Sequence, residues 1–559
     1  MNDSGAPRRA ADPADTPFTS WDLDDGDGAP DKTAAPESRR RHLRSSILLT
    51  LASAVLPGSG LLGAPRRGLK ILGAVTATLA LVAGVTLAYF ALTDMPRVAR
   101  FAANTRFLTL ATTGLAVGAV VWVALIALTH IVTRPAGLRR GKRALGAVVV
   151  TALAFGVAAP TAVAARYSRD TTLALSSVLQ SGDDVKSNNR PSIVANAPDP
   201  WANQARVNIL LLGGDGSASR ADAVAKYSIR TDTIMVASID TKTGETTLIQ
   251  IPRNLQYTPF PDGSEMAAAF PDGFRGEGDA GEWFVNTIWS HVELDYPNLM
   301  TGSTHRGADA LKQGVEGITG LQINQFVLLN IDGLESLIDA MGGVTVNINE
   351  ELAIGGDTAK GVSPKEFLQP GPNQHLMGRD AMWYARSRYN TDDYNRMARQ
   401  SCLINAIVDQ ANPQTLLTNF EPIARASSQM LLTDITDDQL GAYIDLAFRV
   451  KDGGTIKRVV FSNGKFGYSY ADPDFEKMHQ VVQAAIAPAP TPAPPATSAA
   501  PTAPATASAP ATASAPATAS APATPATPTS APATAATATP NDAEGVQTVA
   551  DACAYNPQS

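Results

Sequence analysis

Long hydrophobic stretches dominate the first third of the chain. Three apolar runs, at about residues 70–93, 107–132 and 144–165, are each long enough to cross a hydrocarbon core, which takes about 20 helical residues. We therefore predict a transmembrane helix in each. A shorter run at residues 46–64 contains a Pro-Gly-Ser-Gly sequence, which would leave backbone groups unsatisfied in lipid if the run crossed the bilayer. We predict that this run is re-entrant and returns to the side from which it entered.

Charged residues indicate the orientation of these helices. The chain of 559 residues has 45 Lys and Arg against 52 Asp and Glu, a net charge of −7. Within residues 38–169, however, 17 basic residues accompany a single acid, Asp94. The bases cluster at residues 39–44, 66–70 and 134–143. Positively charged loops favour the cytoplasm, so three crossings would carry everything after about residue 166 out of the cell. A four-crossing topology would instead leave that part in the cytoplasm.

The segment from about residue 203 to residue 486 has the pattern of a single soluble domain. Strand-length apolar runs occur at residues 207–213, 233–239, 247–251, 325–330, 344–348 and 456–461. Helical patterns occur at residues 333–341, 376–388, 395–411, 414–428 and 436–448. This alternation predicts the α/β class, an α/β/α sandwich with a mixed central sheet, joined to the membrane unit by a linker at 166–202. Residues 257–282 have no period and are typical of a lid or binding loop.

The ends of the chain have compositions that cannot form a packed core. Residues 1–45 begin with a stretch rich in acids, Pro, Ala, Gly and Ser, which predicts a disordered cytoplasmic tail. Residues 487–540 contain only Ala, Pro, Thr and Ser and predict a disordered, extended segment, either a wall-threading spacer or an inert linker. A short mixed segment, 541–559, follows it.

Two cysteines and six histidines argue against a structural zinc site or a disulfide-dense scaffold. Since Cys402 and Cys553 are the only cysteines, they could pair in an oxidising compartment and tie the C-terminal segment to the domain. The alternative is a buried Cys402 and an unpaired Cys553. The charge-poor stretches also exclude a simple soluble enzyme, a coiled coil and a nucleic-acid binder.

Polar residues stand at the ends of the predicted strands. Asp215 follows the first strand, Arg230 and Asp232 precede the second, and Arg253 follows the third. Two acids without His or Cys suit a hard cation such as Mg²⁺, which takes oxygen ligands and shares them with substrate phosphates. Taken singly, each of these residues could equally form a strand-end ion pair or a turn.

Residues 383–400 are the most informative stretch. Four arginines and two acids lie around the end of one predicted helix and the start of the next: Arg386, Arg388, Asp392, Asp393, Arg396 and Arg399. Arginine in preference to lysine suits bidentate binding of phosphate. A structural Arg/Asp network remains the alternative for some of them, notably Arg399. The stretch lacks a Ser-His-Asp arrangement, a P-loop or a dinucleotide fingerprint, so acyl transfer and nucleotide hydrolysis are disfavoured.

Together these residues resemble the LytR-CpsA-Psr family of cell-envelope phosphotransferases. The matching motifs follow the family's order over residues 207–411. They are Asn-Ile-Leu-Leu-Leu-Gly-x-Asp at 208–215, Arg-Thr-Asp-Thr at 230–233, Ile-Pro-Arg at 251–253, Asn286, Leu-Ile-Asp-Ala-Met-Gly-Gly-Val at 337–344, and Arg386-x-Arg388 through to Arg399-Gln400. Two positions depart from the family: Asn254 replaces a common acid, and Val285 replaces a usual basic residue.

The resemblance implies an extracytoplasmic domain on a multi-pass membrane protein. It also implies metal-dependent transfer of an anionic glycopolymer, such as a teichoic acid or arabinogalactan, from a polyprenyl-pyrophosphate carrier to peptidoglycan. The partners are then the lipid-linked glycopolymer, the peptidoglycan acceptor and the membrane, without nucleic acid. With water as acceptor, the same site would act as a phosphatase on polyprenyl pyrophosphates. A third possibility is a non-catalytic, membrane-anchored protein that binds wall or lipid or regulates.

Residue roles follow from the resemblance by position. Asp215 and Asp232 would hold Mg²⁺ or Mn²⁺. The catalytic set comprises Arg230, Arg253, Arg386 and Arg388 on the pyrophosphate, with Arg396, Gln400 and Asp392 or Asp393. Further substrate-binding positions are Asn286, Asp339 and Arg399. Phosphoryl transfer requires cationic and carboxylate groups of this kind, since charge on the non-bridging oxygens must be neutralised while the attacking hydroxyl is held in line.

Overall fold

The computed structural model describes residues 36–182, 184–187, 189–194, 197, 199–215, 228–356, 361–389, 392–411, 431–487 and 546–557. The predicted helix at 414–428, the first 35 residues and nearly all of the Ala/Pro/Thr/Ser segment lie outside these ranges. The chain divides into two compact units, one made of Met1–Tyr89 and Thr112–Arg166, the other of Phe90–Ala111 and Tyr167–Ser559. Each unit is described by itself.

Among the residues that the structure describes, three helices are long and apolar enough to cross a membrane, so the chain is membrane-associated. They are α2 (Arg67–Thr93), α4 (Thr105–Thr133) and α5 (Arg140–Val178). Their apolar side chains are largely exposed at the surface of the helices. In a bilayer these side chains would face the lipid hydrocarbon.

The broken first run folds into helix α1 (Pro36–Val55) and the 3-10 helix η1 (Ser59–Gly63). Gly58 has φ 83° and permits a sharp turn between them. The returning chain passes directly against α1, because a Cβ added to Gly60 would lie 2.0 Å from the carbonyl oxygen of Leu49. Hydrogen bonds between hydroxyl groups join α1 to α4, and Ser53 Oγ lies 2.9 Å from Thr129 Oγ1. The run therefore turns back on itself within the unit.

The second unit is built on a seven-stranded sheet in the order β11-β10-β3-β2-β1-β4-β9. Its strands are β1 (Arg206–Gly214), β2 (Thr231–Asp240), β3 (Thr246–Ile251), β4 (Gln325–Asn330), β9 (Leu431–Thr433), β10 (Ile456–Val460) and β11 (Gln547–Thr548). The pairs β1–β4 and β3–β10 are parallel and the others antiparallel. The predicted mixed sheet is therefore confirmed.

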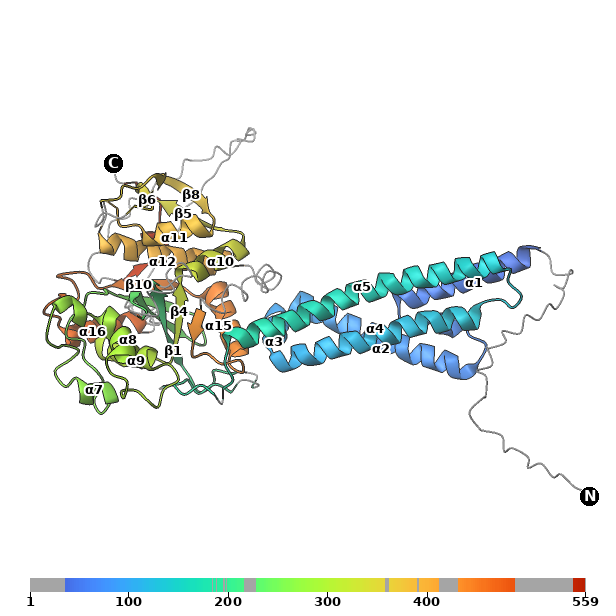
Figure 1. The fold of residues 1–559 in the computed structure, drawn as a ribbon, viewed down its shortest axis with the longest axis horizontal. Helices are drawn as coiled ribbons and strands as arrows, with labels where there is room; N and C mark the ends of the chain where they lie inside the picture. Colours follow the sequence, from blue (N-terminus) through green and yellow to red (C-terminus); the bar gives the residue numbers. More distant parts are fainter. Residues whose placement is uncertain are drawn as a thin grey trace, which may run out of the picture. The chain divides into compact units, whose positions relative to one another are not determined.

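Helices cover both faces of this sheet (Figure 1). Because side chains alternate along a strand, Leu210 and Leu212 of β1 enter one core while Ile209 enters the other. The first core includes α8 (Ile288–Leu294), α9 (Arg306–Thr319) and α16 (Phe475–Ile486); the second is covered by α12 (Asp393–Gln410) and α15 (Leu440–Gly453). The result is the predicted three-layer α/β/α arrangement.

One predicted strand lies outside the central sheet. β5 (Val344–Ile348) pairs with β8 (Gly371–Leu376), and β6 (Leu352–Ile354) pairs with β7 (Glu366–Leu368). β5 alternates buried and half-buried residues, and its buried face packs with α11 (Gly378–Arg386) and α12 in a separate apolar cluster. The preceding helix, α10 (Ile331–Met341), ends at Gly342 with φ 84°.

The predicted irregular segment is more ordered than its composition suggests. It contains the short helix α7 (Glu265–Ala269), capped by the Ser264 side chain, and a bridge between Thr258 and Phe274. Phe270 and Phe274 are buried in the core under α9. This part of the segment is therefore packed structure, and its charged residues Asp262, Glu265, Asp272 and Arg275 are exposed.

The second unit also contains α3 (Met95–Ala103), a short helix between α2 and α4. Its small residues Ala99 and Ala103 are buried against α15, and Arg100 lies 3.1 Å from Asp445 of α15. A segment between two apolar spans is thus docked on the α/β domain.

Candidate functional site

Asp232 is presented by an irregularity in the sheet. On β1, Gly213 and Gly214 are consecutive, but their partners on β2 are Thr233 and Thr231. Asp232 is the extra residue of a β-bulge, so its side chain leaves the regular alternation of β2. Asp215 follows β1 immediately beyond the same point, which brings both predicted metal-binding acids to one end of the two strands.

Arg253 is the principal partner of Asp232. Its guanidinium donates to Asp232 Oδ1 at 2.7 Å, and the Asn286 amide donates to the same oxygen at 3.4 Å. Partial burial acts to raise the pKa of Asp232, but the positive charges of Arg253, Arg396 and Arg388 outweigh it, so the pKa is lowered. Asp232 is therefore a carboxylate at neutral pH.

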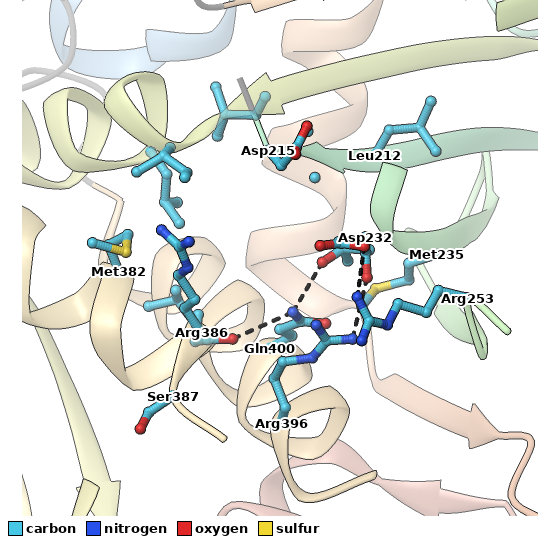
Figure 2. A pocket seen from close by; sticks show the side chains of 18 of the residues that line it. Leu212, Asp215, Asp232, Met235, Arg253, Met382, Arg386, Ser387, Arg396 and Gln400 are labelled. Atoms are coloured by element: carbon cyan, nitrogen blue, oxygen red, sulfur yellow. Dashed lines mark hydrogen bonds and ion pairs between the residues drawn. The ribbon is translucent and has the colours of Figure 1, made fainter. Parts of the chain in front are cut away.

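A second acid, Asp393, joins the same group from helix α12. Arg396 donates to its Oδ2 at 3.0 Å, and its Oδ1 lies 3.7 Å from Arg388 and 3.9 Å from Arg253. Among the described residues, Asp393 Oδ1 is buried without a hydrogen-bond partner. In Figure 2 the guanidinium groups of Arg253 and Arg396 both lie next to Asp232. Three cations thus surround two carboxylates at one point.

These residues line a cavity of about 980 Å³. The cavity lies on the α12 face of the sheet, and one end of it is apolar. The apolar lining comes from strands, from α10 and from the second half of α12: Leu211, Met235, Val327, Leu334, Leu337, Leu403, Ile404 and Ile407. The charged residues just described line the other end. Such a shape suits an amphiphile with an anionic head.

Gln400 stands between the two ends of the cavity. Its amide donates to Thr233 Oγ1 at 2.9 Å and to the Ala385 carbonyl at 3.3 Å. These bonds tie α12 to β2 and to α11. The predicted site residue therefore fixes the distance between the elements that carry the arginines.

Several other predicted residues lie at the margin of the cavity. Asp215 lines it and accepts from the backbone N–H of Arg230 at 3.3 Å, whereas the exposed Arg230 side chain is not part of the lining. Arg386 and Arg388 are exposed at the cavity surface, Arg386 with its guanidinium 5.5 Å from the Trp383 ring. Asn286 is buried behind Asp232 and also donates its backbone N–H to the Arg253 carbonyl at 3.3 Å.

Besides Arg230 and Asn286, three further predicted site residues are not part of the cavity lining. Arg399 is buried and donates to the carbonyls of Tyr384 and Ser387 and to Glu350. Asp339 accepts from the backbone N–H of Gly378 and so joins α10 to α11. Asp392 is exposed and caps α12 through the N–H of Asn395 at 2.8 Å. Of the two adjacent acids, only Asp393 enters the cavity.

Sequence reasoning did not identify the residues that line the apolar end of the cavity. Leu334 and Leu337 are spaced by three residues on α10, and Leu403 and Ile407 by four on α12, so each pair shares a helix face. That spacing was a usable signal, but it is also the spacing of ordinary core residues. Tyr394, which lines the charged end, carried no recognisable signal.

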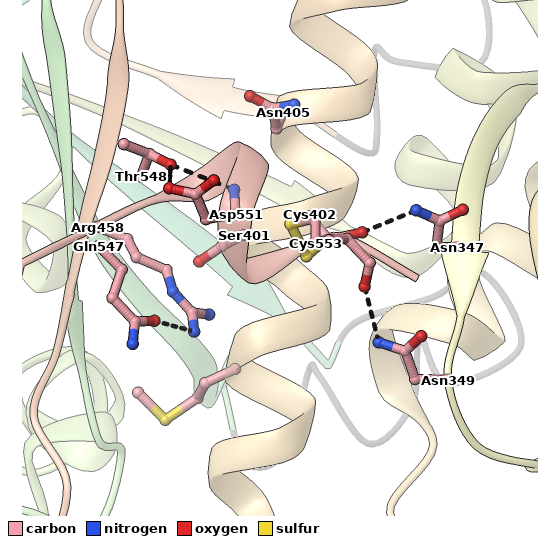
Figure 3. Close-up of a disulfide and its surroundings, with 12 residues drawn as sticks. Asn347, Asn349, Ser401, Cys402, Asn405, Arg458, Gln547, Thr548, Asp551 and Cys553 are labelled. Carbon is pink, nitrogen blue, oxygen red and sulfur yellow. Dashed lines mark hydrogen bonds between the residues drawn. A yellow bond between two sulfur atoms is a disulfide. The ribbon is translucent and has the colours of Figure 1, made fainter. Parts of the chain in front are cut away.

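The helix that carries Asp393, Arg396 and Gln400 is also anchored to the C-terminus (Figure 3). Cys402 of α12 forms a disulfide with Cys553, and their Cα atoms are 5.5 Å apart. The C-terminal residues β11 and α17 (Val549–Ala552) extend the sheet edge at β10 and pack on α12. Asn347 and Asn349, at the end of β5, donate to the carbonyls of Cys553 and Ala554. The C-terminal segment therefore packs against α12, the helix that carries the site residues, and holds it in place.

The donor set is compatible with a magnesium ion shared with substrate. In the described part of the chain, no three His, Cys, Asp or Glu side chains cluster as a metal site would require. Asp215 and Asp232 nevertheless offer two hard oxygen donors at one strand end. Mg²⁺ is commonly held by one or two carboxylates while waters and phosphate oxygens complete its shell, so these two residues fit it.

The sequence matches the model of a known protein family. The model of the LytR_cpsA_psr family matches residues 171–485, more than half of the chain. The chain belongs to the LytR_cpsA_psr family. The matched residues include every element that lines the cavity.

Two proteins of this family illustrate how similar the sequence of this chain is to its relatives. The cell wall biosynthesis protein LcpA of Corynebacterium glutamicum is 24% identical over 50% of this chain and 56% of its own length. A polyisoprenyl-teichoic acid–peptidoglycan teichoic acid transferase, TagU of Enterococcus faecalis, is 26% identical over 50% of this chain and 79% of its own. The chain therefore spans little more than half of the first relative. The crystal structure of TagV from Bacillus subtilis matches at 20% identity with a TM-score of 0.33, covering 50% of this chain and 97% of that one.

Proposed function

We propose that this protein transfers a glycopolymer, together with its linking phosphate, from a polyprenyl-pyrophosphate carrier to peptidoglycan. One observation carries the proposal. Arg253, Arg388 and Arg396 converge with Asp232 and Asp393 at the charged end of a cavity whose other end is apolar. An amphiphile with a pyrophosphate head and a hydrocarbon tail matches both ends of this cavity, and the names of the family relatives agree with it.

Within this proposal, the arginines neutralise the pyrophosphate oxygens. The hydroxyl oxygen of the acceptor forms a bond to the phosphorus that bears the glycan. The bond from that phosphorus to the bridging oxygen breaks, and polyprenyl phosphate leaves. The proton of the hydroxyl passes to a carboxylate, and Asp393 Oδ1 is suited to this because it is buried and has no hydrogen-bond partner among the described residues. The product is a phosphodiester on peptidoglycan.

Asp215 and Asp232 would hold the divalent metal. When bound, Mg²⁺ or Mn²⁺ neutralises negative charge on the phosphate oxygens as the leaving group departs. Asp232 needs no proton removed for this role, because its pKa is already lowered by the neighbouring arginines.

We further propose that the domain lies outside the cytoplasmic membrane on a multi-pass anchor. The basic clusters at residues 66–70 and 134–143 favour a cytoplasmic location for the loops that contain them. The Cys402–Cys553 disulfide supports the same orientation, since disulfides persist in oxidising compartments. A reporter fused at residue 180 tests the orientation directly.

Full-length protein in lipid vesicles provides the test of activity. Incubation with a polyprenyl-pyrophosphate-linked disaccharide, peptidoglycan fragments and Mg²⁺ should yield a phosphodiester-linked conjugate and free polyprenyl phosphate, both detected by mass spectrometry. Arg253→Ala should abolish both products, while Arg275→Ala, which alters an exposed arginine paired with Asp272, should leave them unchanged. Release of polyprenyl phosphate with only free glycan phosphate would show that water is the acceptor and would contradict transfer.

A further inference from the structure

The lining of the cavity changes in character along helix α12. From its beginning, the residues of α12 that line the cavity are Asp393, Tyr394, Arg396, Gln400, Leu403, Ile404 and Ile407. A helix rises about 1.5 Å per residue, so Ile407, at the apolar end of the cavity, lies roughly 20 Å along α12 from Asp393 and Tyr394. The helix therefore orders the site as a first part with Asp393 and the uncharged Tyr394, an anion-binding part at Arg396, and an apolar part.

This order fixes the side from which an acceptor must approach. The following argument rests on the proposed function, in which the polyprenyl chain occupies the apolar end. The attacking and leaving oxygens of phosphoryl transfer are roughly in line through the phosphorus. Because the leaving polyprenyl phosphate lies toward Leu403 and Ile407, the acceptor hydroxyl has to enter from the opposite end, near Tyr394.

Two uncharged side chains line the cavity at that end. Asn254 follows Arg253 directly, and Tyr394 follows Asp393 directly. A loop after β10 holds both: the Tyr468 hydroxyl donates to Asn254 Oδ1 at 3.1 Å, and the Asn463 N–H donates to the Tyr394 hydroxyl at 3.0 Å. Tyr468 is 1% exposed, so its hydroxyl is rigidly placed.

These bonds leave donors for a ligand. With Oδ1 of Asn254 occupied, its Nδ2 group is the part of the amide that remains to bind substrate. Tyr394 accepts from Asn463, and its hydrogen bond with Tyr468 raises the pKa of Tyr468, as a bond donated by Tyr468 does, so the hydroxyl proton of Tyr394 can be donated to a ligand. Burial raises the pKa of Tyr468, and Tyr394 and Asp393 raise it further, so Tyr468 stays a neutral donor. Two neutral donors beside a carboxylate suit the hydroxyl and ether oxygens of a sugar.

We propose that Asn254 and Tyr394 form the subsite for the acceptor sugar, with Tyr468 as the positioning residue. Asn254 Nδ2 and the Tyr394 hydroxyl donate to oxygens of the sugar, while Oδ1 of Asp393, which has no hydrogen-bond partner in the described part of the chain, accepts from the attacking hydroxyl. The neutral amide of Asn254 suits an uncharged part of the acceptor.

Steady-state kinetics of the full-length protein in vesicles test this subsite. The donor is a polyprenyl-pyrophosphate-linked disaccharide and the acceptor is a peptidoglycan fragment, each varied in turn. Tyr468→Phe and Asn254→Asp each remove one donated hydrogen bond and should raise the acceptor KM about 3- to 10-fold, with the donor KM unchanged. Tyr394→Phe should do the same. Tyr470→Phe, at a 47% exposed tyrosine in the same loop, is the matched control and should change neither constant.

The two ways of failing are distinguishable. Absence of conjugate with the unsubstituted protein would refute the proposed function itself. Transfer by the unsubstituted protein, combined with a raised donor KM or a lowered kcat at constant acceptor KM in Tyr468→Phe and Asn254→Asp, would overturn the subsite. Thermal unfolding of each variant completes the test, because a melting temperature equal to that of the unsubstituted protein shows that the kinetic change is local.

Discussion

Cys402 and Cys553 are joined by a disulfide although they lie 151 positions apart in the sequence. Cys402 lies in the middle of α12, and Cys553 follows α17 at the C-terminal end of the chain. The chain leaves the domain after α16, which ends at Ile486, and returns to it at β11. The described residues on either side of positions 488–545 thus belong to one domain, and the disulfide closes a covalent loop from Cys402 to Cys553.

Removing the disulfide should destabilise the domain. Cross-links limit the unfolded chain and are typically worth about 2–4 kcal/mol, so we expect Cys402→Ser with Cys553→Ser to lower the free energy of unfolding by about that amount. The C-terminal brace of α12 should loosen at the same time. Differential scanning fluorimetry of the purified protein measures the loss, and unsubstituted protein in reductant should behave like the double variant. An unchanged melting temperature in both would contradict the bracing role.

The closed loop can be tested separately by cutting it. A protease site inserted near residue 515 should, after cleavage, leave a single species on a non-reducing gel and two on a reducing gel. Two species without reductant would show that the cysteines are unpaired. The same insertion made at residue 557, beyond Cys553, is the matched control and should release only a few residues in either condition.

The strands with the strongest apolar runs were predictable, whereas short edge strands and the pairing of β5 were not. β9 and β11 have three and two residues, too few to show a period. β5 was recognised as a strand, but its partner β8 is set by packing against α11 and α12. Tertiary contacts of this kind leave no trace in local sequence.

The residue types that form the site were predictable from the sequence, but the arrangement of their side chains was not. The arginine block identified Arg388 and Arg396, yet the bulge that presents Asp232 depends on the register of β1 and β2. Asp392 and Asp393 are equivalent in sequence, and only the start of α12 makes one a helix cap and the other a cavity residue.

Arg388 and Arg399 should respond oppositely to substitution. Arg388 is exposed at the cavity and lies 3.7 Å from Asp393, so Arg388→Ala should lower kcat/KM at least 100-fold with little change in stability. Arg399 is buried and bonds two carbonyls and Glu350, so Arg399→Met should cost about 2–4 kcal/mol of stability because those acceptors lose their partner. Transfer assays and thermal unfolding, run on both variants, separate the two roles. A stable but inactive Arg399→Met protein would assign Arg399 to the site instead.

The ionised carboxylate of Asp232 should stabilise the folded protein, and this contribution should be lost at acidic pH. Its pKa is lower in the folded protein than in the unfolded chain, so the contribution is present above the unfolded pKa of about 4 and is lost as the pH falls through the folded value. Asp232→Asn should therefore be less stable than the unsubstituted protein at pH 7, and the difference should shrink below pH 4. Melting temperatures of both proteins between pH 3 and pH 7 provide the comparison. A difference that is constant with pH would show that Asp232 gains nothing from Arg253 in the folded state.

The contact of α3 with α15 should depend on the pairing of Arg100 with Asp445. Both side chains are mostly buried, and burial raises the pKa of Asp445 despite the opposing effect of Arg100. Arg100→Ala removes the ion-pair partner of the Asp445 carboxylate and leaves Arg449 as the remaining positive charge acting on it, so we expect faster hydrogen exchange in α3 and a loss of about 1–2 kcal/mol. Asp445→Asn in the same protein should restore most of the loss, because the uncompensated charge is gone. Purely additive effects of the two substitutions, in a double-mutant cycle read by hydrogen exchange, would mean that the buried alanines alone dock α3 on the domain.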